Sequence, residues 1–226
     1  RAVAARLTYL AQDRFELRCA AKVASKNMSC PREVDLQTLK RVARYLAQCP
    51  RAVQTFEWQL TGNAIVTHTD SDWAGDKQDR KSTSGGTMSL GAHTIKTWSS
   101  TQHCIAMSSG EAELYTLVKG AAQTKGLMSM MADYGISTTG TVCTDATAAI
   151  GMAHRQGLGK TRHVDVQYLW IQQEIAERRL ALDKVRTDAN PADLFTKPLS
   201  REVIDKHLVT LGVQLYRERA RDALTV

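Results

Sequence analysis

The fold class of this chain is decided by the stretch Ala64-Ile65-Val66-Thr67-His68-Thr69-Asp70. It is rich in β-branched residues and ends on a carboxylate, which predicts a β-strand that delivers Asp70 to the edge of a sheet. A second stretch of this kind, Thr141-Val142-Cys143-Thr144, is followed directly by Asp145. Two such strands would place both carboxylates at one edge if they were neighbours, which the sequence alone does not show.

The segments around these strands alternate between strand and helix patterns. Two further short strands are expected on either side of Gly91, so the first three strands can pair as an antiparallel meander. Apolar residues at spacings of three and four predict a long helix from about Ser109 to Tyr134. The order of elements predicts an α/β (α+β) domain with helices packed on a mixed sheet. The other expected elements are a polar loop over 75–86, strands over 87–90, 94–98 and 180–185, a helix ending near His154, helices over 164–178 and 201–211, a helix start at Pro191, and a frayed end over the last fifteen residues.

Residues 1–61 differ from the rest of the chain in pattern and in charge. They read as helical, with a clear helix from Asp35 to Gln48 whose second side carries Lys40, Arg41 and Arg44. They hold 11 Lys and Arg against 5 Asp and Glu, so almost all of the net charge of +7 lies there. A basic segment of this kind suits a polyanionic partner, and a solvated helix surface explains the charge equally well.

The composition excludes several classes of protein. With 226 residues, of which 43% are hydrophobic and 23% charged, the chain is typical of a globular protein. It holds no apolar run of about 18 residues, so no membrane span is expected. Its five cysteines form no C-x-x-C pair, which argues against a disulfide framework and structural zinc and favours an intracellular compartment over secretion. A start without Met or a signal peptide indicates a fragment of a longer chain.

Three more acidic residues are candidates for the same sheet edge. Glu111 and Glu113 stand in the first turn of the long helix, and Asp193 stands in the first turn of a late one. Taken singly, each is explained by the favourable interaction of an acid with a helix dipole. Helical geometry does not choose between Glu111 and Glu113, and Asp72 could face the same way as Asp70 if the strand continued.

A cluster of such carboxylates would need a cation. Gathered carboxylates repel and raise each other's pKa, so the group persists when a divalent metal neutralises it. Oxygen ligands without Cys or His select Mg²⁺ or Mn²⁺. Two such ions about 4 Å apart can activate a water and stabilise the departing oxygen in phosphodiester hydrolysis. The spacing of the acids therefore predicts a candidate metal site, but it does not show that the acids lie together.

Five blocks of sequence carry a more specific signal. They are Thr69–Asp76 with Asp79–Gly85, Trp98–Gln102 with Ser108–Glu113, Thr144–Ile150, Thr161–Val166, and Ala192–Leu199. In this order, over about 130 residues, they resemble the ribonuclease H domain of copia-type retrotransposon polyproteins. Upstream, Leu39–Leu46 resembles the segment that joins reverse transcriptase to ribonuclease H in the same polyproteins.

The resemblance implies a ribonuclease H-like fold, with a five-stranded mixed sheet and flanking helices after a small helical segment. It implies an endonuclease that uses two Mg²⁺ ions, or Mn²⁺ in their place, to hydrolyse the RNA strand of RNA–DNA hybrids during reverse transcription. Its partners would be the hybrid and the reverse transcriptase region of the parent polyprotein, in a cytoplasmic virus-like particle or the nucleus. The implied domains are a reverse transcriptase tail over 1–61, ribonuclease H over 62–200, and a C-terminal helix and tail over 201–226. The implied catalytic and metal-binding tetrad is Asp70, Glu113, Asp145 and Asp193.

Two basic loops are candidates for contacts to the hybrid. Hydroxyl side chains can recognise the 2′-hydroxyls of RNA, and basic side chains can reach phosphates. A solvated loop and a structural histidine are the plain alternatives. The candidates are Arg80, Lys81, Ser82, Thr83 and Ser84 after the first strand, and Arg162 and His163 before a helix.

The sequence departs from the family pattern at three positions. Ala146 stands where Asn is usual, Leu114 where Tyr is common, and Gly110 where Thr is usual. The loss of a hydrogen-bonding side chain beside Asp145 leaves open a catalytically impaired nucleic-acid-binding or interaction module of the same fold. A strand transferase of the integrase type is a further alternative, but such enzymes place a Glu as their last acidic ligand, and here that residue is Asp193.

Overall fold

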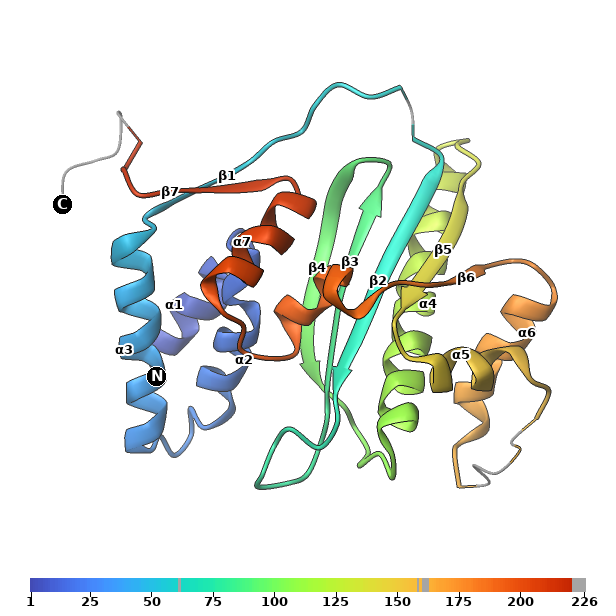
Figure 1. The fold of residues 1–226 in the computed structure, drawn as a ribbon, viewed down its shortest axis with the longest axis horizontal. Coiled ribbons are helices and arrows are strands. Elements are labelled where there is room, and N and C mark those ends of the chain that lie inside the picture. The colour runs from blue at the N-terminus through green and yellow to red at the C-terminus, as the bar shows by residue number, and fades with distance from the viewer. Residues whose placement is uncertain (61, 158, 160–162, 221–226) are drawn as a thin grey trace. The chain divides into compact units, whose positions relative to one another are not determined.

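A computed structural model describes residues 1–60, 62–157, 159 and 163–220 of the chain (Figure 1). The chain divides into two compact units, Arg1–Glu57 with Pro198–Val226 and Trp58–Lys197. The residues from Pro198 onward therefore group with the N-terminal helices, whereas the sequence indicates a C-terminal segment of its own after residue 200.

The first unit is built from helices around a small apolar core, in which Leu7, Leu17 and Val42 are buried. A two-stranded antiparallel ribbon, β1 with β7, joins the segment after α3 to the segment after α7 within this unit. The expectation of a frayed C-terminal end is therefore wrong for Val213–Tyr216, because these residues pair with a strand that lies more than 150 positions away. The elements are α1 (Ala2–Leu10), η1 (Phe15–Leu17), α2 (Arg18–Lys26), α3 (Glu33–Gln48), β1 (Arg51–Gln54), α7 (Arg201–Thr210) and β7 (Val213–Tyr216).

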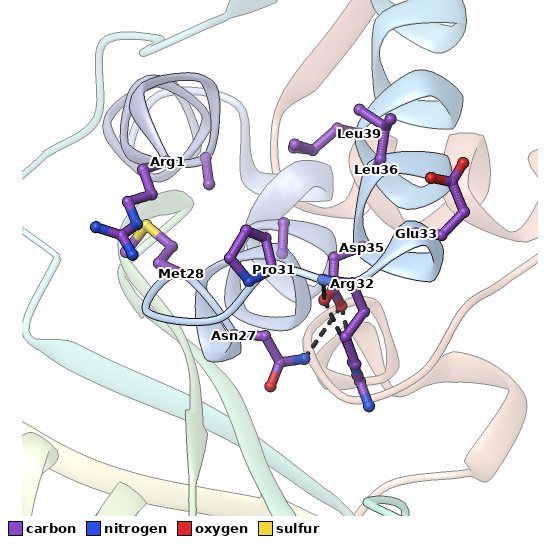
Figure 2. A pocket seen from close by; sticks show the side chains of 11 residues that line it. Arg1, Asn27, Met28, Pro31, Arg32, Glu33, Asp35, Leu36 and Leu39 are labelled. Carbon is purple, nitrogen blue, oxygen red and sulfur yellow. Dashed lines mark hydrogen bonds and ion pairs between the residues drawn. The ribbon is translucent and has the colours of Figure 1, made fainter.

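Helix α3 begins two residues earlier than the sequence indicates, and a carboxylate holds its start. Asp35 accepts hydrogen bonds from the backbone N of Arg32 at 2.8 Å and from the side chain of Asn27 at 3.1 Å (Figure 2). The hydrogen bond from the Arg32 backbone is the main reason why the pKa of Asp35 lies below its ordinary value, and the side-chain bonds add to the effect. A cavity of about 360 Å³ lies beside this turn (Figure 2).

The second unit contains a five-stranded mixed sheet in the order β4-β3-β2-β5-β6. The first three strands form the expected antiparallel meander, and β5 and β6 add to it in parallel. The expectation of a five-stranded mixed sheet is confirmed. The structure also shows that β2 and β5 are neighbours, which the sequence left open. The strands are β2 (Ala64–Asp72), β3 (Thr83–Leu90), β4 (His93–Thr101), β5 (Thr139–Thr144) and β6 (Ala181–Lys184).

The long helix α4 (Ser109–Asp133) runs across one face of this sheet (Figure 1). The Thr67 and Thr124 hydroxyls join strand to helix at 2.7 Å. Gly120 lets the backbones approach, because a Cβ there would collide with the side chain of Thr69. Smaller elements complete the unit: α5 (Thr147–His154), η2 (Val166–Leu169), α6 (Trp170–Ala176), η3 (Thr187–Ala189) and η4 (Pro191–Phe195).

Two expected elements differ from the structure. The predicted loop over 75–86 ends early, because β3 already begins at Thr83 and continues the meander beside β2. The helix expected over 164–178 is split into the 3₁₀ turn η2 and the short helix α6. No helix in the described part of the chain is both long and apolar enough to cross a membrane.

Candidate metal centre

Three carboxylates converge at one edge of the sheet. Asp70 lies near the end of β2, Asp145 directly follows β5, and Glu113 lies in the first part of α4. One oxygen from each carboxylate lies within 4.8 Å of one from each of the others. The register explains the first two positions, because His68 is opposite Cys143 and the acids follow two residues later on parallel strands.

The two glutamates of α4 have different surroundings. Glu113 joins the acidic cluster, and its Oε1 accepts a hydrogen bond from the backbone N of Ser71 at 3.2 Å. Glu111 instead accepts from the hydroxyl of Tyr115, from the backbone N of Met107 at 3.0 Å and from Nε2 of His163 at 2.8 Å. The structure thus makes the choice that helical geometry left open.

Burial and mutual repulsion make this cluster costly to ionise. Burial raises the pKa of Asp70 to about 7. The hydroxyl of Thr196 and the charge of Lys197 lower this pKa, and the charges of Asp193 and Asp145 raise it further. Burial and then the charge of Asp70 raise the pKa of Glu113 to about 8. At neutral pH Glu113 mostly, and Asp70 in part, keeps a proton that a bound cation would displace.

The donor set fits a hard divalent cation. Glu113 Oε2 is buried and has no hydrogen-bond partner among the described residues, so one ligand oxygen is unused. The cluster itself contains carboxylates and neither Cys nor His, which is the ligand chemistry of Mg²⁺ or Mn²⁺. Asp70, Glu113 and Asp145 would hold such an ion.

Asp193 lies beside this cluster but is not one of its three members. It sits in the first turn of η4, which begins with Asn190 as a cap and Pro191 at the first position. The ammonium of Lys197 lies 3.0 Å from Asp193 Oδ1 and 3.7 Å from Asp70 Oδ2. Asp193 therefore reaches the cluster through a lysine, and its role as a metal ligand stays a prediction.

Asp72 stays outside the cluster. Its carboxylate accepts hydrogen bonds from the backbone N and, at 2.9 Å, from the hydroxyl of Thr83. Asp72 thereby joins the end of β2 to the start of β3, so the possibility that it shares the metal edge with Asp70 does not hold in this structure.

The predicted hydroxyl contacts to substrate are buried in the protein. Ser82 accepts from the backbone N of Ala74 at 3.0 Å, and the Ser84 hydroxyl lies 2.7 Å from that of Thr116. Together with Thr83 these side chains are buried, because the strand begins where the sequence indicates a loop. They support the sheet and offer no free hydroxyl to a sugar.

The basic side chains predicted to contact the substrate are more exposed than the hydroxyl side chains. Arg80 is exposed and Lys81 half-buried in the loop before β3, so both can still reach a phosphate. His163 is half-exposed and donates to Glu111. Arg162 lies outside the described residues.

Sequence reasoning missed two residues that contact Asp70. Thr196 donates a hydrogen bond from its hydroxyl to Asp70 Oδ2, and Lys197 forms the ion pair given above. Both belong to the block Ala192–Leu199, from which only Asp193 was selected. The signal was the block itself, which carries polar side chains one turn after its acid.

A sheet in this order, with α4 across one face and acids at the ends of two parallel strands, defines a domain of ribonuclease H fold. No protein-family model matches the chain. The retrovirus-related Pol polyprotein from transposon RE1 of Arabidopsis thaliana is 32% identical over 218 residues, which are 94% of this chain and 15% of that protein. The corresponding polyprotein from transposon TNT 1-94 of Nicotiana tabacum is 28% identical over 184 residues, 80% of this chain and 14% of that protein.

Over most of its length the chain is similar to a segment of the retrovirus-related Pol polyproteins of transposons. It spans about 15% of the length of the relatives that it matches. Among solved structures, LC11-RNase H1 isolated from compost is 18% identical, with a TM-score of 0.41 over 65% of this chain and 99% of that one. The assignment of the fold rests on the order and register of the strands themselves.

Proposed function

We propose that this chain is the ribonuclease H of a retrotransposon polyprotein and hydrolyses the RNA strand of RNA–DNA hybrids with divalent metal ions. The observation that carries the proposal is the convergence of Asp70, Glu113 and Asp145 from three separate elements. Three acids placed together, of which Asp70 and Glu113 are buried, are unfavourable in themselves, so their assembly supports a cation for which they are arranged.

The residues of the chain prepare the site for that cation. The hydroxyl of Thr196 holds one oxygen of Asp70, and the backbone N of Ser71 holds one oxygen of Glu113. These bonds fix the carboxylates, which must release their protons before a cation binds. Asp193 would complete the site. Bound cations would orient the attacking water and offset the charge that develops on the scissile phosphate.

The substrate and the partners follow from charge and from the family. Arg80 and Lys81 would contact phosphates close to the site, and the basic excess of residues 1–61 would add affinity for a polyanion. His163 and Arg162 stay candidates for a second contact. The parent polyprotein would supply the reverse transcriptase region that makes the hybrid, within a particle or in the nucleus.

A catalytically impaired binding module is the second candidate, and it rests on Ala146. This residue follows Asp145 and has no side-chain group to bond with the site. Gly110, in contrast, does not support impairment. A Cβ at this position would lie 2.9 Å from Cβ of Ala148, so close packing of α4 on α5 requires a glycine there.

The test is cleavage by the whole chain in Mg²⁺ of labelled RNA–DNA hybrid, duplex DNA and duplex RNA. We expect cuts only in the RNA of the hybrid, lost in Asp145→Asn and retained in Asp133→Asn, a control at the exposed end of α4. Binding of hybrid without cutting by the wild type would support the module. Equal cutting of duplex DNA would contradict the proposed specificity.

A further inference from the structure

Two consecutive residues after η4 both contact Asp70. Thr196 donates a hydrogen bond from its hydroxyl, and the Lys197 ammonium lies 3.7 Å from Oδ2. The same ammonium lies 3.0 Å from Asp193 Oδ1, one helical turn earlier. Lys197 thus bridges two acids of the proposed site that belong to different elements, β2 and η4.

The position of this lysine matches an electrostatic need of the site. Buried carboxylates that face one another without a cation destabilise the folded chain. The Lys197 ammonium contacts both Asp70 and Asp193, so it places a positive charge directly beside the cluster.

We infer that Lys197 is the internal counter-ion of the metal centre: it holds Asp70 and Asp193 together in the metal-free protein and gives way when a divalent cation binds. The inference rests on the proposed function in that it takes these acids to bind a cation. It makes Lys197 a positioning residue whose charge competes with the metal.

The geometry permits such an exchange. The Lys197 side chain is 41% exposed, so its ammonium can leave the acids for solvent along a flexible stem. Asp70 is almost fully buried and is also held by Thr196, so it stays in place when the lysine leaves. A half-exposed ion pair is weak enough for a divalent ion to displace.

The test is Mn²⁺ affinity of the full chain, measured from the paramagnetic resonance signal of the free ion. Lys197→Gln should bind Mn²⁺ about 3- to 10-fold more tightly than wild type, because the competing charge is gone. Lys197→Arg, which keeps the charge, should bind as wild type does. Lys125→Gln is the matched control, since Lys125 is also half-exposed and lies 3.2 Å from a buried carboxylate, that of Glu174.

Thermal unfolding in a chelator gives a second readout. Without metal, Lys197→Gln should unfold at a lower temperature than Lys125→Gln, and saturating Mn²⁺ should remove most of this deficit. Should Lys197→Gln fail to fold, Lys197→Met replaces it in both measurements. Unchanged or weaker Mn²⁺ binding in the neutral variant overturns the inference.

The outcome also separates this inference from the proposed function. If neither wild type nor any variant binds Mn²⁺, the metal-dependent function fails. The counter-ion role is then judged by the metal-free unfolding temperatures alone, and equal values for Lys197→Gln and Lys125→Gln overturn it.

Discussion

Asn190 donates a hydrogen bond from its side-chain amide to the backbone carbonyl of Thr69 at 3.0 Å, across 121 positions of the chain. Its side-chain oxygen also accepts from the backbone N of Ala192, so one residue caps η4 and joins it to β2. Thr69 directly precedes Asp70, and η4 carries Asp193. Asn190 is therefore the link that sets two acids of the proposed tetrad beside each other.

Asn190→Ala should lower the free energy of unfolding by about 2 to 4 kcal/mol, because a helix cap is lost and a buried carbonyl is left without a partner. Urea unfolding measures this. The control is Asn63→Ala, at an exposed position in the same unit, which should change stability little. If Asn190→Ala lowered the free energy of unfolding no more than Asn63→Ala does, Asn190 would not link η4 to β2 in the way described.

Substitutions of Glu111 and Glu113 should have opposite effects, one mainly on stability and the other mainly on activity. Glu113→Gln should lower cleavage at least about 100-fold, because a ligand is lost, and should leave the protein as stable or more so, because repulsion with Asp70 ends. Glu111→Gln should cost about 1 to 3 kcal/mol of stability, since three donors share that carboxylate. Cleavage assays and urea unfolding of both variants measure these effects. If Glu111→Gln abolished cleavage and Glu113→Gln lost stability, Glu111 would be the ligand and Glu113 the structural residue.

The pKa shifts predict that stability without metal falls as pH rises. Asp70 and Glu113 have pKa values of about 7 and 8 in the folded chain, above their ordinary values of 3.8 and 4.5. The folded state therefore binds more protons than the unfolded state between about pH 4 and pH 8, so raising the pH through this window favours unfolding. Thermal midpoints in a chelator should fall between pH 5 and pH 8, and Mg²⁺ should stabilise the protein more at pH 8 than at pH 6.

The variants Asp70→Asn and Glu113→Gln should flatten this profile, because each removes one of the raised groups. A wild-type midpoint that rises or stays level between pH 5 and pH 8 in the chelator would contradict the shifts.

The sequence predicted the sheet because its signals are local. The strand that ends near Asp70 and the strand before Asp145 each show their pattern within a few residues. That the two strands are neighbours is established by the structure and not by the sequence. Ser84 was misplaced because a run of small polar residues looks the same in a loop and in a strand under a helix. The pairing of β1 with β7, and the contact of Lys197 with Asp70, depend on segments more than 120 positions apart, which no local pattern encodes.

Ala146 stands at the N-cap of α5 and makes no capping bond there, which leads to a last prediction. Its backbone angles, φ −78° and ψ 96°, suit an asparagine cap, so Ala146→Asn should raise the free energy of unfolding by about 0.5 to 2 kcal/mol. The same change at Ala122, exposed in the middle of α4, should lower it slightly, because asparagine is a poor helix residue. Urea unfolding of both variants checks the cap, and no difference between them would exclude it. If Ala146 also limits catalysis, cleavage of the hybrid should rise in Ala146→Asn, whereas a binding module should stay inactive.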